Sequence, residues 1–367
     1  MNKILVIGQT PPPFYGQAIM INYLINAKFV NLRIYHIRMD FSDSIVEIGK
    51  KGIKKIYKLI KIILRIIYVK YKYNINIVYY PPAGQNINAI IRDLFILSIS
   101  GFLFKKKIYH FRAAGLSEFL QNKNIIIQNI IKRIYGVPNC SIQLSYLNPK
   151  DGEYFNSKNI KIIPNGIPDI YNINKRKNSS EKLKLLFVGI IKRSKGIFDL
   201  INSIKYINSN IDLELNIVGT FDSIETKTEI ELMIHDDNLL NYVKFTGALD
   251  GFDKWNIYYN SDILCFPTFY ENESFGNVLL EAMMFELPII ATSWRSIPSI
   301  ITDGEEGFLV PINSPKLIAE RIELLSEDEQ LRRKMGKKGR NKFLNKYTID
   351  KHLSKMEKVF NEIINSK

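Results

Sequence analysis

Short apolar segments alternate with helix-like segments along almost the whole chain. Each apolar segment is about as long as one β-strand, and the segments between have helical periodicity. The predicted strands are residues 4–7, 77–80, 107–111, 141–144, 160–163, 185–188, 213–218, 243–245, 263–266 and 288–291. This alternation predicts parallel sheets joined by crossover helices, an α/β fold whose ligands bind at the carboxyl ends of the strands.

One polar segment, "NINKRKNSSEK" at 172–182, interrupts this pattern. A chain of 367 residues with 46% hydrophobic content can bury two cores of ordinary size. We therefore expect an N-terminal domain over 1–170, a linker over 171–182 and a C-terminal domain over 183–348. We expect the last helix, about 349–367, to pack back on the first domain.

The formal net charge is +15, which favours a polyanionic partner: nucleic acid, an anionic membrane surface or a phosphorylated substrate. The two cysteines form neither a disulfide framework nor a metal-binding spacing, which indicates a reducing compartment. The longest uncharged apolar run, residues 94–104, is shorter than the roughly 20 residues that cross a bilayer, so we expect no transmembrane helix. The N-terminus is typical of a first buried strand rather than a secretory signal.

The segment 50–73 predicts an amphipathic helix. Lys54, Lys58, Lys61 and Arg65 form one basic stripe. The apolar face predicted opposite this stripe consists of Ile53, Ile56, Tyr57, Ile60, Ile63, Leu64 and Ile67. The helix either packs on the first domain's sheet or also lies on an anionic membrane, and the two can both hold. Two observations favour the membrane: Leu59, Ile62 and Ile66 widen the apolar arc, and residues 50–92 contain no acidic residue.

The stretch "ENESFGNVLLEAM" at 271–283 places two glutamates around a predicted helix start near Gly276. A helix N-terminus offers free N–H groups to a phosphate, and glycine permits close approach. Glu281 lies in an apolar helix, where a carboxylate is stable if it accepts hydrogen bonds, for example from two ribose hydroxyls. Alternatively, Glu273 and Glu281 are ordinary surface residues.

A basic loop follows the predicted strand 185–188. Lys192, Arg193 and Lys195 precede Gly196, which opens a helical pattern, and they fall where phosphates of a ligand would lie. The loop has neither the P-loop nor the GxGxxG spacing. A solvated turn is the alternative.

Taken together, these segments resemble the retaining glycosyltransferases of family 4, which have the GT-B fold. The matching pieces in the second half are "IPNGI" (163–167), "FVGIIKRSKG" (187–196), "NIVG" (216–219), "VKFTG" (243–247), "ESFGNVLLEAM" (273–283), "LPIIAT" (287–292) and "IPSIITDGEEGFLV" (297–310). The first half matches more loosely, through "PPPFYGQA" (11–18) and "IYHFRAAGLSEF" (108–119).

The resemblance implies two Rossmann-like domains facing a central cleft, with the nucleotide-sugar donor on the C-terminal domain. It implies that Glu273 contacts the donor sugar, that Glu281 holds the ribose hydroxyls and that Lys195 stabilises the leaving diphosphate. The other donor-binding positions that it implies are Gly16, Arg193, Phe275, Gly276, Asn277 and Val278.

Three positions depart from the family pattern. Ile190 replaces an arginine, and Lys192 or Arg193 then supplies the missing charge or the diphosphate is held more weakly. Trp294-Arg295-Ser296 replaces a glycine pair. "HFRA" at 110–113 replaces His-x-His-Gly, so His110 is either catalytic or structural, and Arg112 is a candidate for binding an anionic acceptor.

We therefore expect a hexosyltransferase that uses a nucleotide diphosphate sugar, with a UDP-sugar favoured over a GDP-sugar. The basic balance and the helix at 50–73 suggest a polyprenyl diphosphate-linked glycan acceptor and bacterial surface polysaccharide (O-antigen or capsule) synthesis. The enzyme would be cytoplasmic and peripheral on the inner face of the membrane. Family members need no metal and no cofactor; "ENE" at 271–273 is the nearest metal candidate.

The sequence leaves two other classes of function open. A non-catalytic nucleotide-sugar-binding subunit is suggested by Ile190. A nucleic-acid-binding protein is suggested by charge alone, but no known module is present, and we expect no nucleic-acid partner.

Overall fold

The computed structural model describes residues 1–12, 15–41, 53–171 and 182–366. All of the predicted linker except its first and last residues lies outside these ranges. The chain forms two compact units, one of Met1–Asn165 with Ile349–Lys367 and the other of Gly166–Thr348. The first boundary therefore falls at Asn165 rather than at residue 170.

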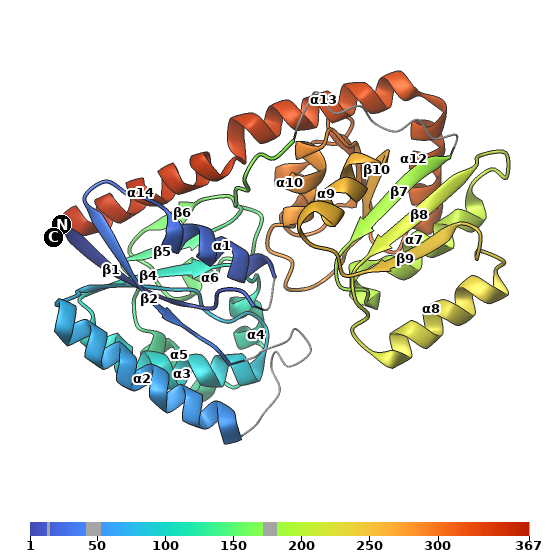
Figure 1. The fold of residues 1–367 in the computed structure, drawn as a ribbon. Coiled ribbons are helices and arrows are strands. Elements are labelled where there is room, and N and C mark those ends of the chain that lie inside the picture. Colours follow the sequence, from blue (N-terminus) through green and yellow to red (C-terminus); the bar gives the residue numbers. More distant parts are fainter. Residues whose placement is uncertain (13–14, 42–52, 172–181, 367) are drawn as a thin grey trace. The chain divides into compact units, whose positions relative to one another are not determined.

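The sheet of the first unit has six strands, all paired in parallel (Figure 1). Its strands are β1 (Asn2–Gly8), β2 (Leu32–Arg38), β3 (Ile77–Tyr80), β4 (Lys106–Phe111), β5 (Cys140–Gln143) and β6 (Ile160–Ile162). Their order is β2-β1-β3-β4-β5-β6. The strand order therefore changes direction between β1 and β3: β2 lies on one side of β1, and β3 to β6 follow on the other.

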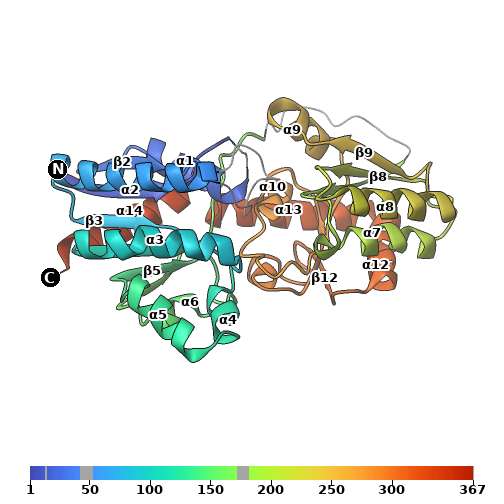
Figure 2. The ribbon, with the colours of Figure 1, turned by 90° about the horizontal axis from the view of Figure 1, so that it is seen from below.

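Helices cover both faces of this sheet. Ile4 and Val6 of β1 join a core with α1 (Gly16–Asn26) and α14 (Ile349–Asn365). Leu5 and Ile7 point to the other face, since alternate residues of a strand face opposite ways. On that face lie α2 (Ile53–Tyr73), α3 (Ile87–Leu103) and α5 (Ile125–Tyr135), with the short helices α4 (Leu116–Gln121) and α6 (Asp151–Tyr154) nearby (Figure 2).

The second unit has a second parallel six-stranded sheet. Its strands are β7 (Leu183–Val188), β8 (Leu213–Val218), β9 (Val243–Gly247), β10 (Ile263–Phe266), β11 (Ile289–Thr292) and β12 (Gly307–Val310). Their order is β12-β11-β10-β7-β8-β9, which is the doubly wound order of dinucleotide-binding sheets. The chain direction reverses between β7 and β10, and such a switch point is where these sheets bind ligands.

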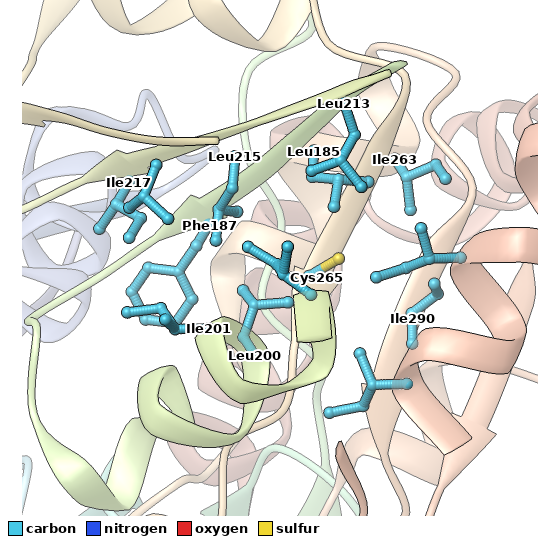
Figure 3. Packing of buried hydrophobic residues seen from close by; sticks show 14 of the residues in the cluster. Leu185, Phe187, Leu200, Ile201, Leu213, Leu215, Ile217, Ile263, Cys265 and Ile290 are labelled. Atoms are coloured by element: carbon cyan, nitrogen blue, oxygen red, sulfur yellow. The ribbon is translucent and has the colours of Figure 1, made fainter. Parts of the chain in front are cut away.

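The core of this second unit is aliphatic. Side chains of β7, β8 and β10, including Phe187, Leu215 and Cys265, pack against Leu200 and Ile201 of α7 (Ile197–Ser203) (Figure 3). Helices α8 (Ile224–Asp236) and α12 (Pro315–Glu327) complete this layer. The remaining helices are α9 (Gly251–Tyr259), α10 (Asn277–Met284), the short α11 (Ile297–Ile300) and α13 (Glu329–Lys346), which packs on α10.

The α/β prediction is confirmed, and every predicted strand overlaps an observed one. Two observed strands, β2 and β12, were not predicted. Each lies at the edge of its sheet. An edge strand is less enclosed and need not be uniformly apolar: β2 carries Arg33, His36 and Arg38.

The orientation predicted for the helix at 50–73 was wrong. Ile62 and Ile66, which were assigned to the margin of the apolar arc, are buried, whereas Ile56, Ile60 and Leu64 are more than half exposed. The helix is apolar around most of its circumference, so periodicity alone does not choose which arc meets the sheet. Packing against Val78 and the neighbouring helices makes that choice.

Candidate functional site

The loops after β7 and β10 meet at the switch point of the second sheet. Lys195 Nζ lies 2.5 Å from Glu273 Oε2, and both side chains are mostly buried. Thr268 Oγ1 also donates to Glu273 Oε2, at 3.5 Å. This ion pair is mostly buried but keeps some exposure, and it lies where such sheets bind ligands. A polar ligand can therefore replace part of the contact between the two side chains.

The two loops are joined through their backbones. Phe269 N donates to Ser194 O at 2.9 Å. Gly196 follows with a φ of +74°, and a Cβ there would lie 1.9 Å from Pro267 O. Only glycine fits both the left-handed backbone and this close approach, so Gly196 is what allows Lys195 to reach Glu273.

The ring of Tyr270 lies close to two lysine ammonium groups of this site. The ring centroid of Tyr270 lies 4.6 Å from Lys195 Nζ and 4.7 Å from Lys192 Nζ. Tyr270 is itself fixed, because Trp294 Nε1 donates to its carbonyl oxygen at 2.9 Å. Glu273 offsets one of these two charges, so the three side chains together keep one positive charge, which suits an anion.

Helix α10 begins beside this surface. Its N-cap, Gly276, has a φ of +78°, and Phe275 before it is buried. Asn277 and Val278 occupy the first turn, whose N–H groups and helix dipole favour negative charge. The helix start predicted near Gly276 is therefore present.

Glu281 lies farther along α10 and is held on two sides. Lys254 Nζ is 2.5 Å from Oε1, and the Tyr258 hydroxyl donates to Oε2 at 2.6 Å. Burial, followed by the charge of Glu281, raises the pKa of Tyr258 well above 10.0, so Tyr258 is a hydrogen donor at all ordinary pH values. A carboxylate has about four acceptor positions, so Lys254 and Tyr258 use only about half of them.

Both glutamates are only 8% exposed, so the alternative that they are ordinary surface residues was wrong. The side chain of Arg193 has a different partner. Its guanidinium pairs with Glu229 at 2.6 Å, and its side chain is 63% exposed. Of the two candidates to replace the cation missing at Ile190, Lys192 is the one beside Lys195.

The remaining predicted residues, Gly16, His110 and Arg112, belong to the first unit. Gly16 is exposed at the first position of α1. His110 is fully buried, and its Nδ1 lies 2.8 Å from the Tyr79 hydroxyl. Burial and then the charge of Arg112 lower the pKa of His110 well below 6.5, and this placement favours the structural alternative for His110.

Arg112 is also largely buried. Its Nε donates to the Tyr79 hydroxyl at 3.2 Å, and an Nη donates to Asn165 Oδ1 at 3.1 Å. The acceptor-binding role predicted for Arg112 stays a prediction.

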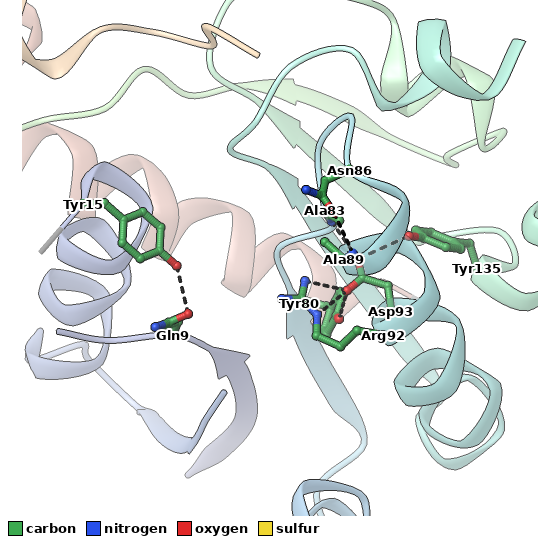
Figure 4. A network of polar contacts seen from close by, with 9 residues as sticks. All are labelled: Gln9, Tyr15, Tyr80, Ala83, Asn86, Ala89, Arg92, Asp93 and Tyr135. Atoms are coloured by element: carbon green, nitrogen blue, oxygen red, sulfur yellow. Dashed lines mark hydrogen bonds and ion pairs between the residues drawn. The ribbon is translucent and has the colours of Figure 1, made fainter. Parts of the chain in front are cut away.

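The carboxyl edge of the first sheet holds a different network (Figure 4). Asp93 is fully buried and accepts hydrogen bonds from Tyr80 Oη at 2.6 Å, from Ala83 N at 2.7 Å and from Tyr135 Oη at 3.2 Å. Arg92 completes the set, with an Nη 2.7 Å from Asp93 Oδ1. This carboxylate is saturated by protein groups and fixes the loop after β3.

Sequence reasoning missed three residues of the second unit: Lys254, Tyr258 and Tyr270. The first two are four residues apart on α9 and so share one helix face. The helical spacing was a usable signal, but α9 itself was not predicted. Nothing in the sequence around Tyr270 shows that its ring would meet two lysines from another loop.

Comparison with known proteins finds a family for part of the chain. The model of the family described as "Glycosyl transferases group 1" matches residues 170–342. The matched residues lie within the C-terminal unit, Gly166–Thr348, and place this part of the chain in that family.

The curated relatives are similar over part of their length. The capsular polysaccharide biosynthesis glycosyltransferase CapM of Staphylococcus aureus is 32% identical over 179 residues, which cover 48% of this chain and 46% of CapM. The N-acetyl-alpha-D-glucosaminyl L-malate synthase of Bacillus anthracis is 28% identical over 187 residues, covering 51% and 47%. The chain thus spans about half the length of these relatives.

Solved structures resemble the fold over the whole chain. Sucrose-phosphate synthase from Thermosynechococcus elongatus aligns with a TM-score of 0.76 at 18% identity and covers 100% of both chains. Anabaena HepE in complex with UDP aligns with a TM-score of 0.74 at 15% identity, covering 98% of this chain and 100% of HepE. The fold is the two-domain GT-B fold.

Proposed function

We propose that this protein transfers a sugar from a nucleotide diphosphate sugar to an acceptor hydroxyl, with retention of configuration. The observation that carries the proposal is the Lys195–Glu273 pair, 2.5 Å apart at the switch point of a group 1 glycosyltransferase domain. The pair supplies a cation for a leaving phosphate and a carboxylate for sugar hydroxyls, at the place where such sheets bind nucleotides.

The proposed mechanism is electrostatic. Breaking the anomeric C–O bond leaves negative charge on the departing diphosphate, and fixed cations and dipoles aimed there lower the barrier. Lys195 and the first N–H groups of α10 would face that charge, with Lys192 beside them on Tyr270. Glu273 would hold the donor sugar. As in the family mechanism, the leaving phosphate oxygen would help to deprotonate the acceptor on the same face of the sugar.

Glu281 is proposed to hold the two ribose hydroxyls with the acceptor positions that Lys254 and Tyr258 leave open. We favour UDP-sugars over GDP-sugars; the fold relative HepE was solved with UDP. We propose that neither a metal ion nor a cofactor takes part, because Lys195 and α10 already provide positive charge.

The proposed acceptor is a lipid-linked glycan, such as a polyprenyl diphosphate oligosaccharide, in capsule or O-antigen synthesis. The similarity to CapM, named for capsular polysaccharide biosynthesis, supports this choice. The proposed location is the cytoplasmic face of the bacterial membrane. The net charge of +15 is assigned to this surface and to phosphate groups, not to nucleic acid.

The test is a screen of UDP- and GDP-sugars for hydrolysis and for transfer to lipid-linked acceptors, with and without EDTA. We expect turnover with a UDP-sugar that EDTA does not change. Glu273→Gln should abolish most of that turnover, whereas Glu327→Gln, at the end of α12, should not. A protein that binds a nucleotide sugar but turns over none would be the non-catalytic subunit instead. Neither binding nor turnover across the panel would refute the proposal.

A further inference from the structure

The outer surface of α2 is apolar where a solvent-facing helix is normally polar. Tyr57, Ile60, Leu64, Tyr68 and Tyr71 lie on one face at spacings of three and four residues, and each is 53–70% exposed. The opposite arc, with Ile62 and Ile66, already packs in the core. This exposed stripe is therefore additional to what the fold of the unit uses.

The neighbouring helix α3 carries a second stripe. Ile87, Ile91, Phe95, Ile99 and Phe102 recur at spacings of three or four residues, and Phe102 is 92% exposed. Helix α3 packs between α2 and α5, and Figure 2 shows the helices in one layer. On α5, Ile126 and Ile130 are 65% and 51% exposed. We call the exposed apolar side chains of α2, α3 and α5 the outer apolar face.

The charge of this layer has one sign. In the sequences of α2, α3 and α5 the only acidic residue is Asp93, which is fully buried. Basic residues flank the apolar stripes, and Lys61, Arg65 and Arg133 are exposed. An apolar face with a basic margin and no exposed acid is complementary to an anionic lipid surface, with aromatic rings at the level of the headgroups.

We propose that the outer apolar face binds an anionic phospholipid bilayer, with α2, α3 and α5 lying in the plane of the headgroups and their apolar side chains inserted. This deepens the proposed function, because it names the surface that would bring the enzyme to a lipid-linked acceptor. The face consists of three helices, not of the helix at 50–73 alone. Within the described residues, no helix is both long and apolar enough to span a membrane, so this contact is interfacial.

Charge also argues against self-association through this face. A twofold dimer sets the same patch of both copies together. Here that would place Lys61 and Arg65 of one copy near the same residues of the other, with no exposed acid on these helices to compensate.

The experiment is sedimentation of the full chain with vesicles of phosphatidylcholine, alone or mixed with phosphatidylglycerol, over a range of salt. We expect binding to the anionic vesicles only, weakening as salt rises. Lys61→Gln with Arg65→Gln should weaken partitioning roughly 25-fold, since each basic residue near such a surface contributes about fivefold. Lys334→Gln with Lys337→Gln on α13, also exposed, is the charge-matched control.

Insertion is tested by Leu64→Ser with Phe102→Ser, which we expect to weaken partitioning at least about tenfold. The matched control in the second unit is Leu240→Ser with Phe252→Ser, whose native side chains are exposed to a similar degree. If the charge variants lose vesicle binding and the apolar variants do not, the proposal that apolar side chains insert into the bilayer is overturned. No vesicle binding, or self-association that Leu64→Ser abolishes, would overturn the whole proposal.

The outcome is separable from that of the proposed function. Hydrolysis of a donor in solution needs no vesicles, so an enzyme that fails to bind vesicles still shows turnover. If the protein binds vesicles but turns over no donor, the membrane-binding proposal stands and the transferase proposal is refuted.

Discussion

The two sheets have the same parallel architecture but use charge at their carboxyl edges in opposite ways. In the second unit, Lys195 and Glu273 face each other with few other partners and keep some exposure. In the first, Asp93 is fully enclosed, with Tyr80, Tyr135, Arg92 and a backbone N–H around it. A saturated carboxylate fixes a loop, whereas one with acceptor positions to spare is available to a ligand.

The outer helical layers differ as well. In the second unit, α7, α8 and α12 pack their apolar residues into the core, with only scattered exposed ones such as Ile224, Leu232 and Leu324. In the first, α2, α3 and α5 leave whole apolar stripes outside. The comparison supports two proposals, donor chemistry in the second unit and membrane attachment through the first.

The largest effect should come from removing the cation of Lys195 at the carboxyl edge of the second unit's sheet. We expect Lys195→Met to lower kcat/KM about 10²–10³-fold, the range seen when one group that stabilises transition-state charge is lost. Steady-state transfer assays measure this, with exposed Lys337→Met as the control. A loss below tenfold would mean that the Lys195–Glu273 pair is structural, and the contrast between the two edges would fail.

The matching change at the first edge should act on stability instead. Asp93→Asn weakens the contacts to Tyr80, Tyr135 and Arg92, and we expect it to lower the free energy of unfolding by about 3 kcal/mol. Denaturant titration measures the loss, and Asp236→Asn, in an exposed position, is the control. A variant of normal stability with abolished turnover would place catalysis at the first edge.

Gly196 allows the two loops of the second edge to meet. Gly196→Ala meets Pro267 O and strains the backbone, and we expect it to cost about 2 kcal/mol of stability together with activity. Gly247 also has a positive φ, +75°, but a Cβ there meets nothing within 4 Å. Gly247→Ala should therefore cost only the backbone strain, about 1 kcal/mol, with activity retained. Equal effects on activity would show that loop contact does not matter.

At neutral pH the smallest effect is expected for His352 of the first unit, because its contribution to stability appears only in acid. Burial, followed by the charge of Arg112, lowers the pKa of His352 to about 3. The unfolded chain therefore binds a proton between about pH 3 and 6.5 that the folded chain does not, and stability rises with pH across that window.

Removing the histidine should flatten this rise. We expect His352→Gln to reduce the slope by up to about 1.4 kcal/mol per pH unit, whereas His235→Gln, at an exposed position, should leave it unchanged. Asp151, whose pKa burial raises to about 6, contributes the opposite slope, so the comparison is between variants and wild type. Identical slopes would mean that His352 is protonated in the folded state.

The sequence predicted the parts of this fold that depend on local pattern. Apolar runs marked the central strands, and Gly196 and Gly276 marked two helix starts. Strands β2 and β12 escaped because edge positions impose weaker hydrophobic requirements. The face of α2 that meets the sheet was misjudged because the helix is apolar on two sides, and only tertiary packing distinguishes them.

The same division holds for the candidate site. Glu273, Lys195 and Glu281 were predicted from motif and spacing. The partners of Glu281 were not, because Lys254 and Tyr258 come from another helix that packs beside α10. Arg193 was predicted with Lys195 because they are neighbours in the chain, yet its partner is Glu229 on α8.

The assignment of α14 to the first unit affects the order in which the protein can fold during synthesis. Met356, Val359, Phe360 and Ile363 close one face of the first sheet, whereas residues 166–348 form the second unit without interruption. A nascent chain can therefore complete the later domain first. We expect the earlier domain to wait until residue 363 has left the ribosome, because the part of that face that α14 covers, including Tyr79 beside Phe360, stays exposed until then. Chaperones would be most needed in that interval.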